Sequence, residues 1–201
     1  MNDFILLATP YWINIIILVP ILLFYYWSKH KLSINRNILI LTALFGTSFG
    51  FIEAAVVVYL RAALGFLPGY KGTLMDVWRE SANFYYNQQL VVNELPLSLL
   101  TVEFIREAFT IIMLLLVAFI AVKNLREKIA IFLWAFAFWD IFYYVFLYLT
   151  VRWPTSLTTP DLLFLIPEPW ISQVWFPILI SSLTIIAVFV NSKYKKSKTN
   201  E

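Results

Sequence analysis

The chain has 201 residues, of which 61% are hydrophobic and 13% are charged, and its formal net charge is +3. Soluble domains average roughly 45–50% apolar and about 25% charged residues, so this composition excludes a water-soluble fold. The absence of Cys excludes disulfides and thiolate metal sites, and the single His, His30, argues against haem, copper and histidine-ligated di-iron centres. We therefore expect one transmembrane helical domain over residues 1–201, without a bound metal or other cofactor.

Five hydrophobic runs are long enough to cross a bilayer, which requires about 20 mostly apolar residues. They cover approximately residues 4–27, 38–60, 99–122, 129–151 and 171–190. The N-terminus has no basic segment and no small-residue cleavage site, so we expect a retained first span and not a removable signal peptide. The pattern predicts an all-α integral membrane protein with five transmembrane helices.

Basic residues gather in the connections on one side of this predicted topology. Ten of the 15 Lys and Arg residues lie in the first connection, the third connection and the C-terminal tail, residues 191–201. Positive charges in short loops mark the cytoplasmic side. We therefore expect a multi-pass protein of the cell membrane with its N-terminus outside and its C-terminus in the cytoplasm. The same clustering argues against nucleic acid as a partner and leaves the lipid bilayer as the expected surrounding.

The second run carries Gly46 and Gly50 in a GxxxG pattern, and Glu53 continues the same helix face. Small residues allow helices to approach one another closely in lipid. We expect this face to pack against another helix, with Glu53 pointing the same way. The same two glycines are a candidate homodimer contact, and a membrane partner subunit is a further expectation.

The long connection after the second run contains a predicted amphipathic helix. Thr73 begins a segment of capping-box form, and apolar residues from Leu74 to Tyr85 recur at helical spacing. The helix either lies at the outer membrane interface or packs on the bundle as an ordinary surface helix. Trp78 and Arg79 within it are candidate lid residues.

The third run carries three ionisable residues near its start, Glu103, Arg106 and Glu107. A charged group at membrane depth costs roughly 2.5–3.5 kcal/mol on insertion scales, so such groups usually face a partner or a water-filled site. Spacings of three and four residues place all three on neighbouring positions of one helix face. The two carboxylates either bind a cation or share a proton, or the trio forms a structural ion-pair cluster. An oxygen-only metal site is a third alternative, although we expect no bound metal.

The fourth run carries Asp140 near the middle of the membrane, with Tyr143 and Tyr144 one turn further on. A buried Asp at this depth is expected to be protonated or paired. The Tyr hydroxyls are candidate hydrogen-bond partners for it. Alternatively, the Tyr rings line a path for an aromatic or quaternary-amine ligand through cation–π contacts.

The second outer connection contains a predicted short helix. Thr159, Pro160 and Asp161 resemble a helix start, and prolines end the following apolar run after about two turns. We expect a re-entrant or interfacial helix. It either acts as a lid, with Asp161 and Glu168 near the site, or only anchors the bundle.

These residues predict one polar intramembrane site that opens outward. The candidates that bind substrate or protons are Glu53, Glu103, Arg106, Glu107, Asp140 and Tyr144. The first hypothesis is a proton-coupled transporter, or a binder, of a small polar or cationic substrate. The alternatives are an intramembrane enzyme acting on a lipid or isoprenoid, with a Glu of the third run as general base, and an accessory subunit or assembly factor. The sequence contains no HExxH, GxSxG or Gly-rich phosphate motif that would identify a catalytic class.

Overall fold

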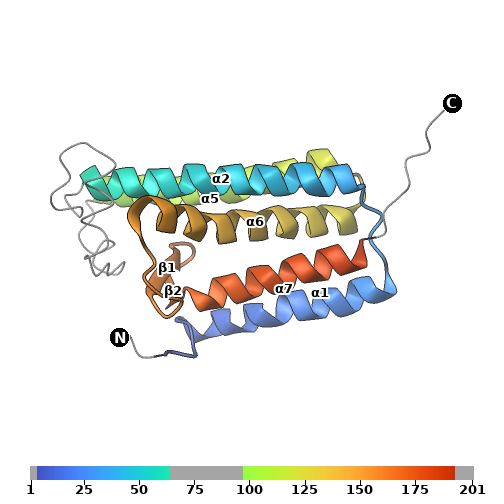
Figure 1. Ribbon diagram of the computed structural model, residues 1–201, viewed down its shortest axis with the longest axis horizontal. Coiled ribbons are helices and arrows are strands. Elements are labelled where there is room, and N and C mark those ends of the chain that lie inside the picture. Colours follow the sequence, from blue (N-terminus) through green and yellow to red (C-terminus); the bar gives the residue numbers. More distant parts are fainter. Residues whose placement is uncertain (1–3, 64–96, 193–201) are drawn as a thin grey trace.

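The structure is a computed structural model that describes residues 4–63 and 97–192 (Figure 1). Its elements in chain order are the 3₁₀ helix η1 (Tyr11–Ile17), α1 (Leu18–Lys29), α2 (Arg36–Ala63), α5 (Leu97–Ala121), α6 (Leu125–Val151), β1 (Pro160–Phe164), β2 (Trp170–Gln173) and α7 (Trp175–Asn191). The amphipathic helix predicted around Trp78 and Arg79 lies outside the described residues, as do the lysines of the C-terminal tail, residues 193–201.

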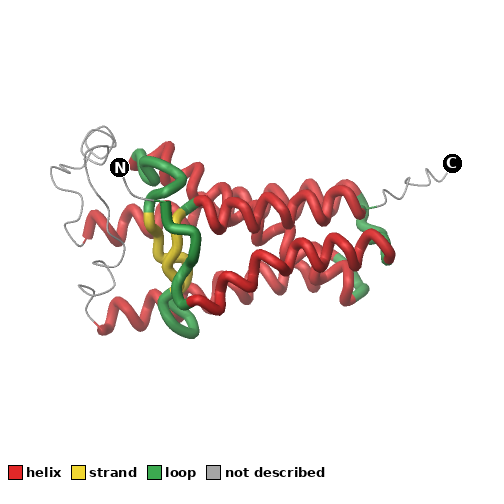
Figure 2. The backbone as a smooth tube through the Cα atoms, turned by 90° about the horizontal axis from the view of Figure 1, so that it is seen from below, coloured by secondary structure: helices red, strands yellow, loops and turns green. Residues whose placement is uncertain are grey.

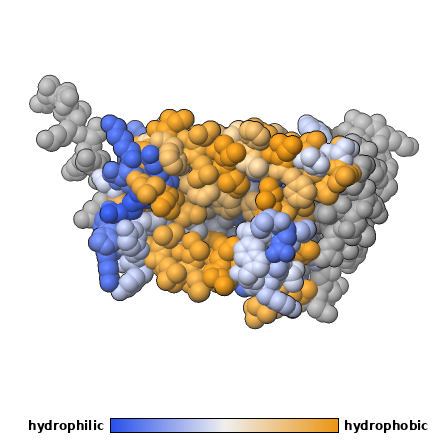
Figure 3. Space-filling model, turned by 180° about the vertical axis from the view of Figure 1, so that it is seen from behind, coloured by the Kyte–Doolittle hydropathy of each residue, from blue (hydrophilic) through white to orange (hydrophobic). Residues whose placement is uncertain are grey.

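Four segments of the described chain are long and apolar enough to cross a membrane: Tyr11–Lys29, Arg36–Tyr59, Leu97–Ala121 and Leu125–Val151. The fifth helix, α7, is equally apolar but has 17 residues. On the face drawn in Figure 3, hydrophobic residues form a belt between two more hydrophilic ends. The mostly helical structure and its apolar exterior indicate a multi-pass membrane protein.

The five α-helices run alongside one another, and consecutive helices run in opposite directions (Figures 1 and 2). Helix α6 is central, because it contacts α2, α5 and α7, while α1 packs on α7. The burial of α6 reflects this position. Ten of its residues between Ala130 and Val151 are buried, and they are spread along its length and over several of its faces. The two strands lie at the end of the bundle where α6 ends and α7 begins.

The GxxxG face of α2 packs against α6, as the predicted helix contact requires. A Cβ atom added to Gly46 would lie 2.4 Å from the carbonyl oxygen of Ala135, and one added to Gly50 would lie 2.7 Å from that of Trp139. Only glycine permits this approach of the two backbones. The contact lies within one chain, where α6 covers Gly46 and Gly50. The homodimer contact through these glycines stays a prediction.

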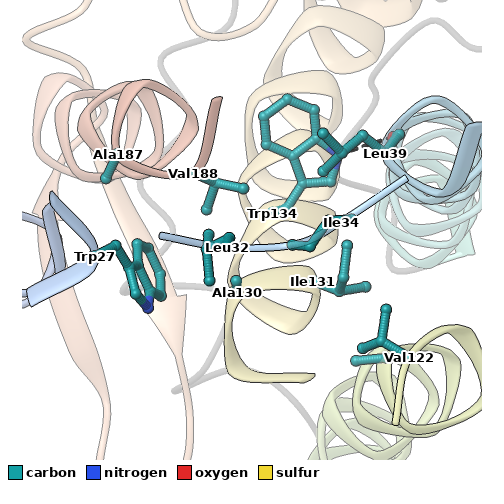
Figure 4. Packing of buried hydrophobic residues seen from close by; sticks show 11 residues of the cluster. Trp27, Leu32, Ile34, Leu39, Val122, Ala130, Ile131, Trp134, Ala187 and Val188 are labelled. Carbon is teal, nitrogen blue, oxygen red and sulfur yellow. Dashed lines mark hydrogen bonds between the residues drawn. The ribbon is translucent and has the colours of Figure 1, made fainter. Parts of the chain in front are cut away.

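The opposite end of the bundle is closed by an apolar cluster to which all five α-helices contribute (Figure 4). Within it, the indole Nε1 of Trp134 donates a hydrogen bond of 2.9 Å to the carbonyl oxygen of Leu39. The connection after α1 meets the first turn of α6 beside this cluster, where the N–H of Ser33 donates to the carboxylate of Glu127 at 3.2 Å. The basic residues after α1 and around the start of α6 therefore lie at the same end of the molecule.

The short helix predicted after Thr159 is wrong, because the residues form an antiparallel β-hairpin. Pro160 pairs with Gln173, and Leu162 pairs with Ile171. A third backbone segment extends the pair, since Thr9 and Ile171 exchange two hydrogen bonds of 2.8 and 2.7 Å. An apolar run of this length is compatible with either a helix or a strand, and the pairing partner decides between them.

The hairpin also shifts the bounds of two predicted spans. The first run does not begin as a helix at Phe4, because residues 4–8 form no helix, Thr9 pairs with Ile171 and helical structure starts at Tyr11. The last run does not begin as a helix at Ile171, because that residue belongs to β2 and α7 starts at Trp175. Backbone groups that pair across strands are unavailable to a helix, so both helices start later than hydropathy alone indicates.

Candidate functional site

A cavity of about 180 Å³ lies at the hairpin end of the bundle, bounded by α2, α5, α6, α7 and the hairpin. All six residues predicted to bind substrate or protons line it: Glu53, Glu103, Arg106, Glu107, Asp140 and Tyr144. Asp161 lines it as well, from β1. Helices that are distant in sequence thus direct their few ionisable residues into one space.

Arg106 lies between two carboxylates from different helices. Its Nε and Nη2 atoms donate to Oε2 of Glu103 at 3.0 and 2.6 Å, and its Nη1 atom donates to Oε1 of Glu53. The side chain of Arg106 is 24% exposed, whereas those of Glu53 and Glu103 are each 11% exposed. The pair within α5 follows from the spacing of three residues, but the pair with α2 depends on how the helices pack.

Glu107 connects α5 to the hairpin. Its Oε2 atom accepts a hydrogen bond of 2.8 Å from the backbone N–H of Leu165, and its Oε1 atom accepts one of 3.1 Å from that of Ile166. These N–H groups follow directly after β1 and have no place in its pairing with β2. A carboxylate that accepts two backbone N–H groups therefore replaces the missing strand partner.

Two further acids in the cavity are held by hydroxyl groups. Asp140 accepts a hydrogen bond of 2.7 Å from Ser181 of α7. Asp161, which is only 1% exposed, accepts one of 2.6 Å from Tyr144. The sequence predicted Tyr hydroxyls as hydrogen-bond partners of Asp140. The hydroxyl of Tyr144 does not fill this role, because it donates to Asp161 on the hairpin.

Aromatic rings form much of the remaining wall. Phe164 of β1 is the centre of this group, with ring centroids 6.1 Å from Phe136, 6.3 Å from Trp139 and 5.4 Å from Trp170. The indole Nε1 atoms of Trp139 and Trp170 are buried and have no hydrogen-bond partner in the described part of the chain. Both tryptophans line the cavity with other parts of their side chains, because the Nε1 atoms themselves are covered.

The four candidates for the outer lid or loop do not lie together in the described structure. Asp161 lies inside the cavity wall and not on an exposed lid. Glu168 does not line the cavity, and its carboxylate accepts a hydrogen bond of 2.8 Å from the indole of Trp12. Trp78 and Arg79 are outside the described residues.

Sequence reasoning missed three features of this site: the hydroxyl of Ser181, the backbone N–H groups of Leu165 and Ile166, and the two unpaired indoles. Ser181 and Ser182 do interrupt the apolar run of α7, which is a usable signal for a polar face. The backbone groups carry no sequence signal, because every residue except proline has an N–H.

Within residues 4–63 and 97–192, no group of three or more His, Cys, Asp or Glu side chains is arranged to hold a metal ion. Comparisons with protein-family models, with curated proteins and with solved structures found no match. The geometry of the cavity is therefore the basis for a functional proposal.

Proposed function

We propose that the protein is a proton-coupled transporter, or a binder, of a small polar or cationic solute in the cell membrane. The observation that carries the proposal is the charge of the cavity. Of the described residues that line it, five are acidic and one, Arg106, is basic. An excess of carboxylates at low dielectric is stable only if protons or cations neutralise them. A proton-coupled transporter of cations binds both species in turn.

The proposal includes five spans with the N-terminus outside. Helix α7 is about 26 Å long at 1.5 Å per residue, close to the thickness of the hydrocarbon core. It runs beside α1 and α6 over the length of the bundle, which supports a fifth crossing. The shared position of the basic connections after α1 and α5 supports a cytoplasmic assignment for that end. The cavity would then open toward the outer side.

The lipid-enzyme alternative is less well supported by the contacts of its candidate residues. A general base needs an oxygen that can reach substrate, but both oxygens of Glu107 accept hydrogen bonds from the hairpin. A phosphate-binding arginine needs open donors, but Arg106 directs Nε, Nη1 and Nη2 to Glu53 and Glu103. These pairs favour a site that binds over one that catalyses.

The first test asks whether water reaches the cavity. The chain has no native Cys, and Thr110, which lines the cavity, is 3% exposed. We expect a Thr110→Cys protein in intact cells to react with a membrane-impermeant thiol reagent. The matched control is Leu114→Cys, one turn further along α5 at a position that is 0% exposed and outside the cavity lining. Equal failure of both proteins to react, in a folded state, would favour the accessory-subunit alternative.

The second test measures transport directly. Purified protein is reconstituted into proteoliposomes on a solid-supported membrane, and a panel of small organic cations is applied across a pH gradient. We expect a transient current that depends on both cation and gradient. The current should be absent from proteoliposomes containing Glu53→Gln, and retained with Glu168→Gln, which changes an acid outside the cavity.

A further inference from the structure

The acids of the cavity differ in the groups that bind them. Glu53 and Glu103 both accept hydrogen bonds from the guanidinium group of Arg106, so a positive charge compensates them. Glu107 accepts a backbone N–H with each of its two oxygens. A proton on any of these three side chains would weaken an ion pair or leave a buried N–H without its acceptor. Protonation of each would therefore cost an existing contact.

Asp161 also uses both of its carboxylate oxygens. Its Oδ2 atom accepts a hydrogen bond of 2.6 Å from the hydroxyl of Tyr144, and its Oδ1 atom accepts one of 2.8 Å from the backbone N–H of Leu162. A protonated carboxyl group donates through one oxygen and loses acceptor capacity there. A proton on Asp161 would therefore compete with one of these two donors.

Asp140 is the exception among the acids that line the cavity. It is 8% exposed, and its Oδ2 atom accepts a hydrogen bond of 2.7 Å from the hydroxyl of Ser181. Its Oδ1 atom accepts no hydrogen bond from a described residue, and no described Lys or Arg forms an ion pair with it. A hydroxyl group can both donate and accept, so Ser181 can bind the carboxylate and the carboxylic acid. Asp140 can gain or lose a proton and keep its contact with α7.

The surroundings of Asp140 are acidic. Asp161 of the hairpin is close enough for its charge to act on Asp140, and two negative charges in a buried space repel each other. Helix α7 adds no titratable group to the described cavity lining, in which Ser181 is its polar residue. The other titratable groups of that lining come from α2, α5 and α6: Glu53, Glu103, Arg106, Glu107, Tyr143 and Tyr144. Arg106 is the base among them and is bound to Glu53 and Glu103, so a proton is the charge that can compensate Asp140.

We propose that Asp140 carries the proton that is exchanged for the cationic solute. When the solute enters, the O–H bond of the Asp140 carboxyl group breaks and the proton passes to solvent water. The positive charge of the solute then offsets the charge left in the cavity, and Asp140 takes up a proton from water when the solute leaves. Ser181 is a positioning residue, because it holds the carboxyl group in both states. This inference rests on the proposed proton-coupled function and assigns its proton to one residue.

Infrared difference spectroscopy detects this proton, because a protonated carboxyl group has a carbonyl stretching band that a carboxylate lacks. Spectra of the purified full chain in proteoliposomes are recorded while the pH is changed within the range in which the protein stays folded. We expect a band that titrates in the unaltered protein and is lost in Asp140→Asn. The control is Glu168→Gln, which changes an acid outside the cavity and should retain the band.

A second pair of variants identifies the band by its hydrogen bond. Ser181→Ala should move the band to higher frequency, because the carboxyl group of Asp140 loses its hydroxyl partner. Ser182→Ala is the matched control on the same helix and should leave the frequency unchanged, since Ser182 binds the carbonyl oxygen of Ile178. This pair decides the question if Asp140→Asn does not fold.

The currents of the reconstituted protein then separate the inference from the proposed function. In Asp140→Asn, the ratio of the cation current with a pH gradient to that without one should fall to one. A titrating band that persists in folded Asp140→Asn, or a frequency unchanged by Ser181→Ala, would overturn the inference. A gradient-dependent current in Asp140→Asn would do the same, and all three results leave the proposed function in place. Absence of any cation current from the unaltered protein would overturn the proposed function and the role of Asp140 with it.

Discussion

Arg106 of α5 and Glu53 of α2 form an ion pair across 53 positions of sequence, at the edge of the cavity. Glu103, one turn before Arg106 on α5, binds the same guanidinium group. Two carboxylates thus share one positive charge, which joins α2 to α5 and leaves the site with excess acid. The direct contact between these two helices is otherwise small compared with the contact that each makes with α6.

Replacing Arg106 by Gln should destabilise the protein by about 2–4 kcal/mol, because two mostly buried carboxylates lose their common partner. The double variant Glu53→Gln/Arg106→Gln should recover part of this loss, since it removes one of the stranded charges. The measurement is the free energy of unfolding in mixed detergent micelles. Arg126→Gln, at an exposed position in the first turn of α6, is the control and should change the free energy of unfolding by less than about 0.5 kcal/mol.

Glu107→Gln should loosen the segment that follows β1. An amide offers one acceptor oxygen where the carboxylate offers two, so one of the N–H groups of Leu165 and Ile166 loses its partner. Hydrogen bonds to a charged acceptor contribute about 1.5–3 kcal/mol, so amide exchange at these two residues should accelerate roughly 10- to 100-fold. Hydrogen–deuterium exchange with mass spectrometry measures the exchange rate of the segment that contains Leu165 and Ile166.

The control for that experiment is Glu168→Gln, which alters a neighbouring acid that binds Trp12 and not the backbone of the hairpin. It should leave the exchange of Leu165 and Ile166 unchanged. Unaltered exchange in Glu107→Gln would show that these hydrogen bonds do not hold the hairpin.

Tyr144→Phe should cost about 1.5–3 kcal/mol of stability, because the buried carboxylate of Asp161 loses its hydroxyl donor. Tyr148→Phe is a matched control on the same helix, since Tyr148 lies one turn further on and is 48% exposed. Thermal unfolding followed by circular dichroism compares the two variants. Similar losses in both would contradict the assignment of Tyr144 as the partner of Asp161.

Gly46→Ala should destabilise the contact between α2 and α6 by about 1–3 kcal/mol, because the new methyl group meets the backbone carbonyl of Ala135. The loss would occur although alanine has the higher helix propensity, worth about 1 kcal/mol in the opposite direction. Ser48→Ala, at an exposed position of the same helix, should be neutral or slightly stabilising. Chemical unfolding in detergent distinguishes the two, and a stabilised Gly46→Ala protein would contradict the close approach.

The features that could be predicted from the sequence depend on short-range patterns. Hydropathy located the long apolar helices, because a span requires about 20 consecutive apolar residues whatever its neighbours are. The GxxxG pattern predicted a close helix contact, and α6 provides it. The spacing of Glu103 and Arg106 predicted their proximity, because residues three apart on a helix are neighbours. The rarity of charge in these runs singled out Glu53, Glu103, Arg106, Glu107 and Asp140, all of which line the cavity.

The partners of those residues were decided only by the tertiary structure. No local pattern pairs Arg106 with Glu53, Asp140 with Ser181 or Glu107 with the N–H of Leu165, since each contact depends on the packing of separate elements. The strand that replaces the predicted helix after Thr159 likewise depends on packing with a segment that is distant in sequence. A short apolar run has no preference strong enough to fix its conformation, so its backbone groups adopt the one in which another segment satisfies their hydrogen bonds.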